Sequence, residues 1–359
     1  MKLGINGRFY GARITGVQRF AQEVTARLAA LEDVVLFVPS DAPADAGLPA
    51  GARVLRGRLA GRVWEQVELS RAALAEGVDV VLHPANAAPI FGPAGVMVIH
   101  DLLPLSHPEA FRPLYREWVR LAHAGPARRA RGVITVSDWS AREIQRLLGI
   151  PEERTTVVLQ GAGPLDAPAP PEAMAHVRER YGLSRPYFLV VAGGDPRKGT
   201  DFLRQVWRGF AASLDADLVA VGGAFGSVHS TGNGTSAPVR ALGHVSDDDL
   251  RALYTGSVAL LVPSEAEGFG RAPLEALACG TRVVAAPYGP VGQVLGAAAD
   301  VIPKHVDVWA DMVRALLAEA PETRRARVTE GRRHAAGFSW DRATEQVARV
   351  CRTAAEGRP

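Results

Sequence analysis

The chain contains little cysteine, little net charge and no block of basic residues interleaved with aromatic ones. Its 359 residues include two cysteines, Cys279 and Cys351, and carry a formal net charge of +3. Two cysteines in apolar helical patterns predict packed thiols and fit neither a disulfide framework nor a metal site. The small net charge is not that of a dedicated nucleic-acid binder, so we expect no nucleic-acid partner.

Long apolar runs are also missing, and none approaches the ~18 residues that a membrane-spanning helix needs. The chain runs from its first residues directly into a strand-like segment at residues 3–5, so we expect no signal peptide and a cytoplasmic location. The basic residues 128–131 allow a weak peripheral contact with the inner face of a membrane, although a solvated helix end explains them better. The sequence does not predict an oligomeric state.

The length predicts about two domains at ~100–200 residues each, and 47% hydrophobic against 22% charged residues supplies two buried cores. Short apolar segments alternate with amphipathic ones, which predicts parallel βαβ units. In the first half, the predicted strands are residues 3–6, 34–39, 78–83, 96–100 and 132–136, and the predicted helices are 17–31, 64–76, 114–129 and 140–148.

A stretch rich in glycine, alanine and proline at residues 161–171 reads as an interdomain linker. A second alternation follows it, with predicted strands at 187–192, 217–222, 240–242, 258–262 and 282–286 and predicted helices at 200–213, 247–254, 273–279 and 308–317. The sequence therefore predicts two doubly wound sheets that face a central cleft. Ligands of such sheets bind beyond the carboxyl ends of the strands.

The segment from Glu267 to Glu275, EGFGRAPLE, opens a predicted helix after a predicted strand. Pro273 fits the first helical position and Gly280 fits the C-terminal stop. A glycine-rich loop at a helix start presents free N–H groups and a positive dipole end, which suit a phosphate or a polar sugar. Both glutamates can accept hydrogen bonds from hydroxyls. On these residues alone, Glu275 could equally complement the helix dipole.

A second glycine-rich turn, residues 193–199, follows the first predicted strand of the second domain. Its adjacent cations, Arg197 and Lys198, suit a diphosphate. No Gly-Lys-Ser/Thr follows at P-loop spacing, and a surface turn is the alternative. His100 and Asp101 end another predicted strand. A histidine there can donate to a sugar hydroxyl, whereas a buried histidine bonded to backbone is the alternative that these residues alone favour.

Other patterns exclude more than they predict. The glycines at residues 4–7 and Gly16 match a dinucleotide fingerprint only loosely, so a dehydrogenase is not indicated. The acidic run 247–249 after Ser246 predicts a capped helix start, and no metal is expected. The glycine-rich loop 222–234 follows a strand and fits either a flexible connection or a close approach of backbone to a ligand.

Taken together, these segments resemble the retaining glycosyltransferases of family four. The most specific stretch runs from residue 242 to 284, LGHVSDDDLRALYTGSVALLVPSEAEGFGRAPLEALACGTRVV, and contains the family's two glutamates separated by seven residues. The segments VIHDLLPLSHPEAF, GVITVSDWSAREIQRLLGI, AGGDPRKGT and FSWDRATEQVARV resemble other parts of that family. Many relatives carry an arginine directly after the glycine of the diphosphate turn. Here Gly194 takes its place and Arg197 adjoins Lys198, which leaves open which cation dominates.

The resemblance implies the GT-B fold, with an acceptor-binding domain at residues 1–165, a donor-binding domain at 166–339 and a final helix at about 340–356 that crosses back to the first domain. It implies a catalytic position for His100, with Asp101 on the acceptor side. It places the donor-site residues along the chain as follows: Gly16 near the donor phosphate or the acceptor, Arg197 and Lys198 at the diphosphate, Val245 near the base, Glu267 at the sugar, Phe269, Gly270, Arg271 and Ala272 along the sugar and phosphates, and Glu275 at the ribose.

The expected reaction is transfer of a hexose from a nucleoside diphosphate sugar to an acceptor hydroxyl with retained configuration and without a metal or another cofactor. The acceptor is a polysaccharide, a lipid-linked sugar or a natural product. Two alternatives stay open. One is a sugar phosphorylase or nucleotide-sugar epimerase of the same architecture, and the other is a catalytically silent nucleotide-sugar-binding protein.

Overall fold

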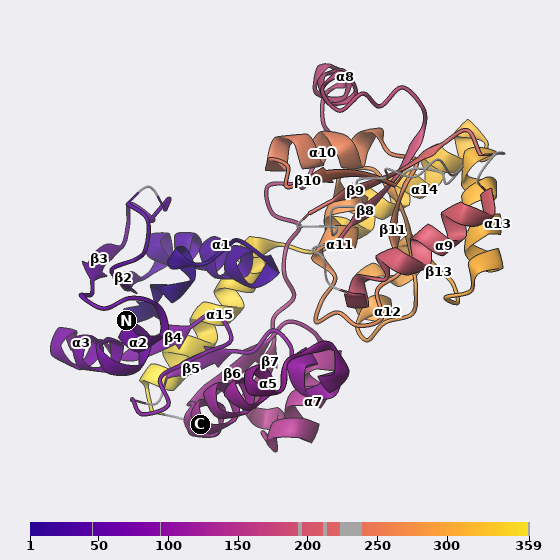
Figure 1. Ribbon diagram of the computed structural model, residues 1–359. Helices are drawn as coiled ribbons and strands as arrows, with labels where there is room; N and C mark the ends of the chain where they lie inside the picture. Colours follow the sequence, from indigo (N-terminus) through magenta and orange to yellow (C-terminus); the bar gives the residue numbers. More distant parts are fainter. Residues whose placement is uncertain (45, 94, 193–195, 211–213, 223–238, 358–359) are drawn as a thin grey trace. The chain divides into compact units, whose positions relative to one another are not determined.

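The computed structural model (Figure 1) describes residues 1–359 except 45, 94, 193–195, 211–213, 223–238 and 358–359. The chain divides into two compact units: unit 1 comprises residues 1–161 and 339–359, and unit 2 comprises residues 162–338. The boundary falls at the start of the predicted linker, and the predicted domain limit at residue 165 lies just after it. Each unit holds one parallel sheet with helices packed on it, so the predicted α/β class with two Rossmann-like domains is confirmed.

Unit 1 is built on a seven-stranded sheet in the order β3-β2-β1-β4-β5-β6-β7. The winding reverses between β1 and β4, which makes a topological switch point at their carboxyl ends. The edge strand β3 and the three-residue strand β7 were not predicted, because neither contains a buried apolar run. The strands are β1 Lys2–Asn6, β2 Asp33–Val38, β3 Arg53–Arg56, β4 Val80–His83, β5 Val96–Val98, β6 Gly132–Thr135 and β7 Thr155–Val157.

The helices of unit 1 bury apolar side chains against this sheet. Helices α2 and α3 pack Trp64 and Leu69 on β2 and β4, whereas α6 and α7 pack on β5 and β6. The predicted helix 64–76 is two helices, and the predicted helix 114–129 contains a π-helical turn at Arg120–Ala124. The helices are α1 Gly16–Leu31, α2 Gly61–Val67, α3 Leu69–Glu76, α4 Leu103–Ser106, α5 Pro113–Val119, α6 Gly125–Arg129, α7 Asp138–Leu148 and α15 Trp340–Ala355, with short 3-10 turns at Gly7–Gly11, Pro108–Ala110 and Glu152–Arg154.

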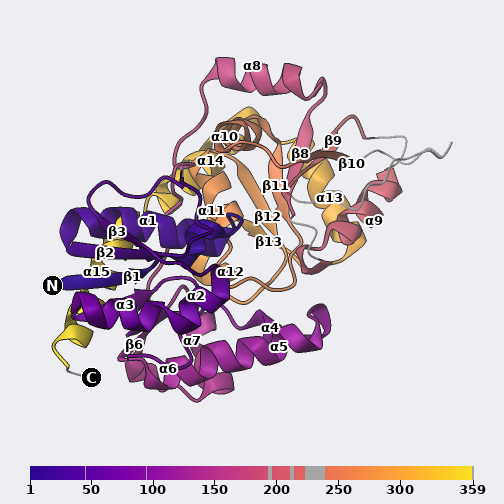
Figure 2. The same ribbon diagram turned by 60° about the vertical axis from the view of Figure 1, so that its left-hand side comes forward.

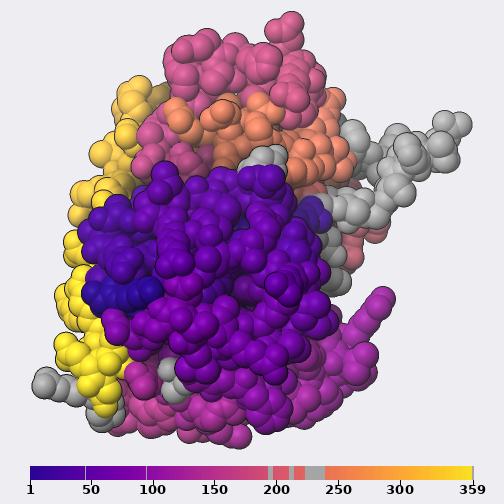
Figure 3. All heavy atoms as spheres, turned by 90° about the vertical axis from the view of Figure 1, so that its left-hand side faces the viewer, coloured from indigo at the N-terminus to yellow at the C-terminus, as the bar shows by residue number. Residues whose placement is uncertain are grey.

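The C-terminal helix α15 belongs to unit 1, where it packs beside α1. The rings of Phe20 and Trp340 lie 5.8 Å apart, and Arg27 donates to Asp341 at 2.8 Å. Figure 3 shows the yellow atoms of this helix against indigo atoms from the beginning of the chain. The two ends of the chain therefore stabilise the same unit.

Unit 2 is built on a six-stranded sheet in the order β10-β9-β8-β11-β12-β13, and its switch point lies between β8 and β11. Helices α9 and α13 pack Trp207 and Trp309 against β8, β9 and β11, while α11 and α14 contact β11 and β12 (Figure 2). The two-residue strand β13 was not predicted. The elements are α8 Pro171–Arg180, β8 Tyr187–Val191, η5 Pro196–Lys198, α9 Thr200–Phe210, β9 Asp217–Val221, β10 Val239–Gly243, α10 Asp247–Gly256, β11 Ala259–Val262, α11 Arg271–Ala278, β12 Arg282–Ala285, α12 Val291–Leu295, η6 Gly296–Ala298, β13 Asp300–Val301, α13 Val306–Leu317 and α14 Pro321–Ala335.

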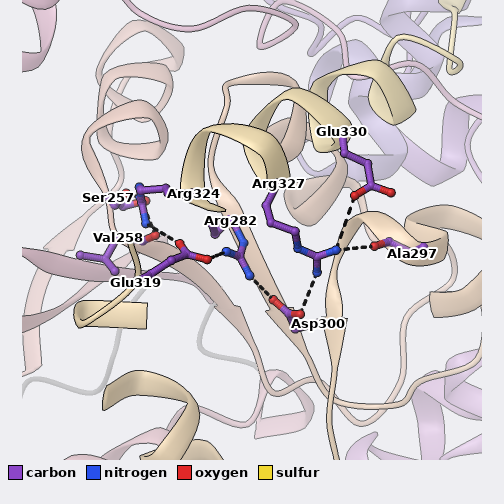
Figure 4. Close-up of polar contacts among 9 residues, drawn as sticks. All are labelled: Ser257, Val258, Arg282, Ala297, Asp300, Glu319, Arg324, Arg327 and Glu330. Carbon is purple, nitrogen blue, oxygen red and sulfur yellow. Dashed lines mark hydrogen bonds and ion pairs between the residues drawn. The ribbon is translucent and has the colours of Figure 1, made fainter. Parts of the chain in front are cut away.

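A network of ion pairs joins the sheet of unit 2 to α14 (Figure 4). Arg282 of β12 is 6% exposed; it donates to Asp300 at 2.6 Å and also pairs with Glu319. From α14, Arg327 donates to Asp300 at 2.8 Å, and Arg324 donates to two backbone carbonyls before β11. Removing one partner of a buried pair is costly, because the other charge stays uncompensated. The network therefore anchors α14, on which α11 packs.

Candidate functional site

The switch point of unit 2 brings together two loops that lie far apart in the sequence. One loop follows β8 and contains η5, and the other follows β11 and leads into α11. The backbone N–H of Glu265 donates to the carbonyl of Arg197 at 2.9 Å. Gly199 has φ +68°, and a Cβ built on it would stand 2.4 Å from the carbonyl oxygen of Pro263. Only glycine allows this close approach, so Gly199 sets how the two loops pack.

An ion pair spans these loops. The Lys198 ammonium donates to Oε1 of Glu267, and the Ser264 hydroxyl donates to the same oxygen at 2.8 Å. The Lys198 side chain is 30% exposed and that of Glu267 is 15% exposed. The structure thus brings together one residue predicted at the diphosphate and one predicted at the sugar, each neutralising the other. Gly193 and Gly194 of the predicted diphosphate turn lie outside the described residues, as does the predicted 222–234 loop beyond Gly222.

Helix α11 begins two residues earlier than predicted, at Arg271, so Pro273 is its third residue and Glu275 lies beyond its first turn. The helix-dipole explanation for Glu275 is therefore wrong, since that effect fades within one turn. Instead, Arg271 donates from Nε to Oε1 of Glu275 at 3.1 Å, and the Tyr254 hydroxyl donates to Oε2 at 3.5 Å. Glu275 is 4% exposed, so its carboxylate is neutralised inside the unit.

Gly270 is the N-cap of α11 and has φ +95°, a left-handed conformation that favours glycine. Phe269 is 4% exposed and packs edge-to-face on Phe338, with ring centroids 6.2 Å apart, so only its backbone can line a site. Ala272 is the second residue of α11, and Val245 is buried between β10 and α10. The roles of Phe269, Gly270, Ala272 and Val245 in a donor site stay predictions.

Two tyrosines near this site were not singled out from the sequence. Tyr254 of α10 is fully buried, and burial together with the nearby Glu275 charge raises its pKa well above the usual value. Tyr288 follows β12, the next strand along the sheet, and burial and the Glu267 charge raise its pKa too. The position of Tyr288 could have been suspected, because the carboxyl ends of the neighbouring parallel strands β11 and β12 share one sheet edge, whereas Tyr254 lies in α10, before β11, and no such signal marks it.

In unit 1, His100 lies just beyond β5 and is 4% exposed. Its Nε2 lies 3.0 Å from the carbonyl oxygen of Pro84, and because a carbonyl only accepts, Nε2 carries the proton. The ring of Phe20 contacts it at 4.9 Å between centroids. Asp101 is half-buried and accepts from the backbone N–H of Leu103 at 3.1 Å. His100 is therefore a buried histidine with a bond to backbone, as in the alternative, and its catalytic role stays a prediction.

Gly16 is the first residue of α1 and is exposed. It follows Thr15, whose side chain forms a capping box with Gln18. Ser246 caps α10 as predicted, because its hydroxyl accepts from the backbone N–H of Asp249 at 3.1 Å. Cys279 and Cys351 are buried thiols whose pKa burial raises to about 12, as the packing prediction requires.

A polar cluster occupies the switch point of unit 1, and sequence reasoning missed it. Asn6, the last residue of β1, donates to the fully buried Glu65 at 2.7 Å and lies 3.3 Å from Nδ1 of His83, the last residue of β4. Arg8 donates to the same Glu65 oxygen at 3.0 Å. Burial lowers the pKa of His83 to about 3. The pKa of His123, in the π-helical turn, falls to about 4 through burial and the charges of Arg8, Arg62 and His100.

These two histidines predict an acid-sensitive unit 1. In the unfolded chain a histidine takes up a proton near pH 6.5, whereas in the folded chain His83 and His123 stay neutral to about pH 3 and 4. The unfolded state then binds more protons, so stability falls as pH drops from about 6.5 towards 4. The slope of the unfolding free energy against pH counts the extra protons that the unfolded state binds. We expect His123→Gln to lower this slope by the equivalent of about one proton, measured by urea unfolding between pH 7 and 4.5. An unchanged slope would contradict the assignment.

Among the described residues, no group of three histidine, cysteine, aspartate or glutamate side chains could hold a metal ion. Over the same part of the chain, no helix combines the length and the apolar character needed to cross a bilayer. The arginines at residues 128–131 donate to backbone carbonyls: Arg128 to Leu148 at 3.2 Å, Arg131 to Ala354 at 2.9 Å, and Arg129 to Ile90.

Two family models match separate parts of the chain. The model described as Glycosyl transferases group 1 matches residues 175–334, and the model described as Glycosyltransferase Family 4 matches residues 14–162. Together they cover most of both units. The chain belongs to the family 4 type of glycosyltransferases, which confirms the resemblance drawn from its motifs.

Curated relatives point the same way. The chain is 37% identical over 216 residues to a D-inositol 3-phosphate glycosyltransferase of Salinispora arenicola, a match covering 57% of this chain and 43% of the relative. It is 29% identical over 239 residues to the O-antigen chain mannosyltransferase B of Escherichia coli, covering 61% of this chain and 59% of that protein. The chain thus spans about half the length of the curated relatives it matches.

Solved structures share the fold. The sucrose-phosphate synthase of Thermosynechococcus elongatus is 20% identical with a TM-score of 0.74, and 98% of each chain is covered. The glycosyltransferase WaaG, involved in lipopolysaccharide biosynthesis, is 19% identical with a TM-score of 0.75, covering 98% of this chain and 99% of its own. Anabaena HepE in complex with UDP-glucose is 18% identical with the same score and coverage. At these identities the likeness shows the GT-B fold.

Proposed function

We propose that this chain transfers a hexose from a nucleoside diphosphate sugar to an acceptor hydroxyl, with retained anomeric configuration and without a metal. The observation that carries the proposal is the pairing of Lys198 with Glu267 at the switch point of unit 2, where open α/β sheets bind their ligands. Relatives of this chain are named as glycosyltransferases, and HepE is described with UDP-glucose.

In the proposed reaction, cations of this site stabilise the leaving diphosphate. Arg197 and Lys198 lie beyond β8, and the N-terminus of α11 adds free N–H groups and a positive dipole end. Arg271, the first residue of α11, has a buried Nη1 without a hydrogen-bond partner among the described residues, so it can still donate to a ligand. The departing phosphate oxygen takes the acceptor's proton, which removes the need for a dedicated base.

The carboxylates have separate tasks in this proposal. Glu267 accepts from hydroxyls of the donor sugar and Glu275 accepts from the ribose. Val245 lies near the base, and the backbone of Phe269, Gly270 and Ala272 lines the sugar and phosphates. In unit 1, His100, Asp101 and Gly16 are proposed to contribute to the acceptor side and the reacting sugar.

A product assay tests the proposal. The protein is incubated in EDTA with UDP-glucose or GDP-mannose and an acceptor panel that includes D-inositol 3-phosphate and mannose-terminated oligosaccharides. Transfer should release the nucleoside diphosphate, and proton NMR should show that the new glycosidic bond keeps the donor's anomeric configuration. A requirement for inorganic phosphate with release of sugar phosphate would identify a phosphorylase. Release of an epimeric sugar would identify an epimerase, and binding without turnover would identify a silent binding protein.

A further inference from the structure

Among the described residues, the buried hydroxyl of Tyr288 has no hydrogen-bond partner, and it lies at the start of α11. The residue is 6% exposed. A Cβ built on Gly270 would stand 2.5 Å from that oxygen, so the hydroxyl lies directly against the backbone at the start of α11. Buried polar groups are nearly always hydrogen-bonded. By contrast, Tyr187 in the same unit donates to the carbonyl of Leu253 at 2.8 Å.

Glu267 lies three residues before Gly270, the residue that the Tyr288 hydroxyl contacts. Its negative charge contributes to raising the pKa of Tyr288, although the two side chains are not hydrogen-bonded. Within the part of the chain that the structure describes, Glu267 accepts hydrogen bonds from Lys198 and from Ser264, and both go to Oε1. The carboxylate therefore turns one oxygen to Lys198 and Ser264, while the Tyr288 hydroxyl, which lies against Gly270 at the start of α11, is an unused donor.

In the proposed function, two anions compete for the Lys198 ammonium: the Glu267 carboxylate and the diphosphate of the donor. Without ligand its ammonium pairs with Glu267, and a bound diphosphate offers it a larger negative charge. When the ammonium turns to the diphosphate, Glu267 loses its strongest donor in a partly buried place, which is costly unless another donor replaces it.

We propose that donor binding exchanges the partner of Glu267: Lys198 turns to the diphosphate, and the Tyr288 hydroxyl becomes the donor to the Glu267 carboxylate. Tyr288 is then a positioning residue that holds Glu267 negative and oriented towards the donor sugar. That donor binding starts this exchange rests on the proposed function. The contact between Tyr288 and Glu267 depends only on the release of Glu267 by Lys198. The two parts can therefore be tested separately.

The first experiment needs no ligand. Tyr288→Phe is compared by thermal unfolding in the wild-type protein and in a Lys198→Met background, where the exchange should already have occurred. We expect no loss of Tm in the wild type, because no hydrogen bond is removed, and a loss of about 2–4 °C in the Lys198→Met background. Tyr187→Phe, which removes an existing hydrogen bond, should lower Tm equally in both backgrounds. An equal change for Tyr288→Phe in both would overturn the exchange.

The second experiment measures affinity by calorimetry with UDP-glucose, GDP-mannose, UDP and GDP. For each ligand that the wild type binds, Tyr288→Phe should lower the affinity about tenfold, whereas Tyr187→Phe should leave the affinity unchanged. In a Glu267→Ala background, Tyr288→Phe should have no effect on affinity. Wild-type affinity in Tyr288→Phe would overturn the exchange while the proposed function stands. A wild-type protein that binds none of the four ligands would contradict the proposed function and, with it, the trigger of the exchange.

Discussion

Replacing Lys198 by methionine is expected to lower the affinity for a nucleoside diphosphate about 100-fold. The change removes a cation from the switch point of unit 2 and leaves the Glu267 carboxylate without its counterion, so the remaining negative charge repels the diphosphate. A hydrogen bond to a charged group contributes about 1.5–3 kcal/mol, and about 2.7 kcal/mol corresponds to 100-fold. Isothermal titration with UDP and GDP measures the effect.

Lys304 supplies the matched control for this prediction. It is also a partly exposed lysine of unit 2 paired with a glutamate, since its ammonium lies 2.7 Å from Glu265. Lys304→Met should leave the affinity within about twofold, because Lys304 pairs with Glu265 and is not one of the cations of the proposed diphosphate site. Equal losses in the two variants would contradict a diphosphate site at Lys198. Arg197→Met, measured beside them, shows which of the two adjacent cations dominates.

Replacing Glu267 by glutamine is expected to lower turnover about 100-fold while nucleoside diphosphate affinity stays the same or rises slightly. The carboxylate is proposed to act on the donor sugar, where fixed charges contribute most in the transition state. The neutral amide also pairs less strongly with Lys198, which frees the ammonium for the diphosphate.

Glu275→Gln should show the opposite division, with affinity lowered about tenfold and turnover at saturating donor changed less. Glu275 is neutralised by Arg271 and contacts Tyr254, so it is held for binding rather than exposed to the reacting sugar. Steady-state kinetics together with calorimetry separate the two quantities. Equal effects of both substitutions on nucleotide affinity alone would contradict the division of roles.

The sequence predicted the sheets well because their central strands are short, buried apolar runs. It failed at β3, β7 and β13, where the strands are short, at a sheet edge or partly exposed. The start of α11 was misplaced because Pro273 fits a first helical position, yet the left-handed Gly270 begins the helix earlier.

Within the candidate site, the motifs named the residues but not their contacts. The pairing of Lys198 with Glu267 joins two loops through the strand order β8-β11, and no local pattern encodes that order. Tyr288 belongs to no recognisable motif. It is placed near the candidate site only because β12 lies beside β11 in the sheet. The unit 1 cluster around Glu65 was missed for the same reason, since β1 and β4 become neighbours only in the fold. The cleft expected between the two domains stays a prediction.

The most direct test of the donor site is a calorimetric titration of the wild-type protein with UDP-glucose and GDP-mannose in EDTA. The proposed function predicts saturable one-site binding of at least one donor without added metal, and the loss of most of that affinity in Lys198→Met but not in Lys304→Met. No saturable binding of either donor, or binding that begins only when Mg²⁺ is added, would contradict a metal-independent donor site built from Lys198, Glu267 and the start of α11.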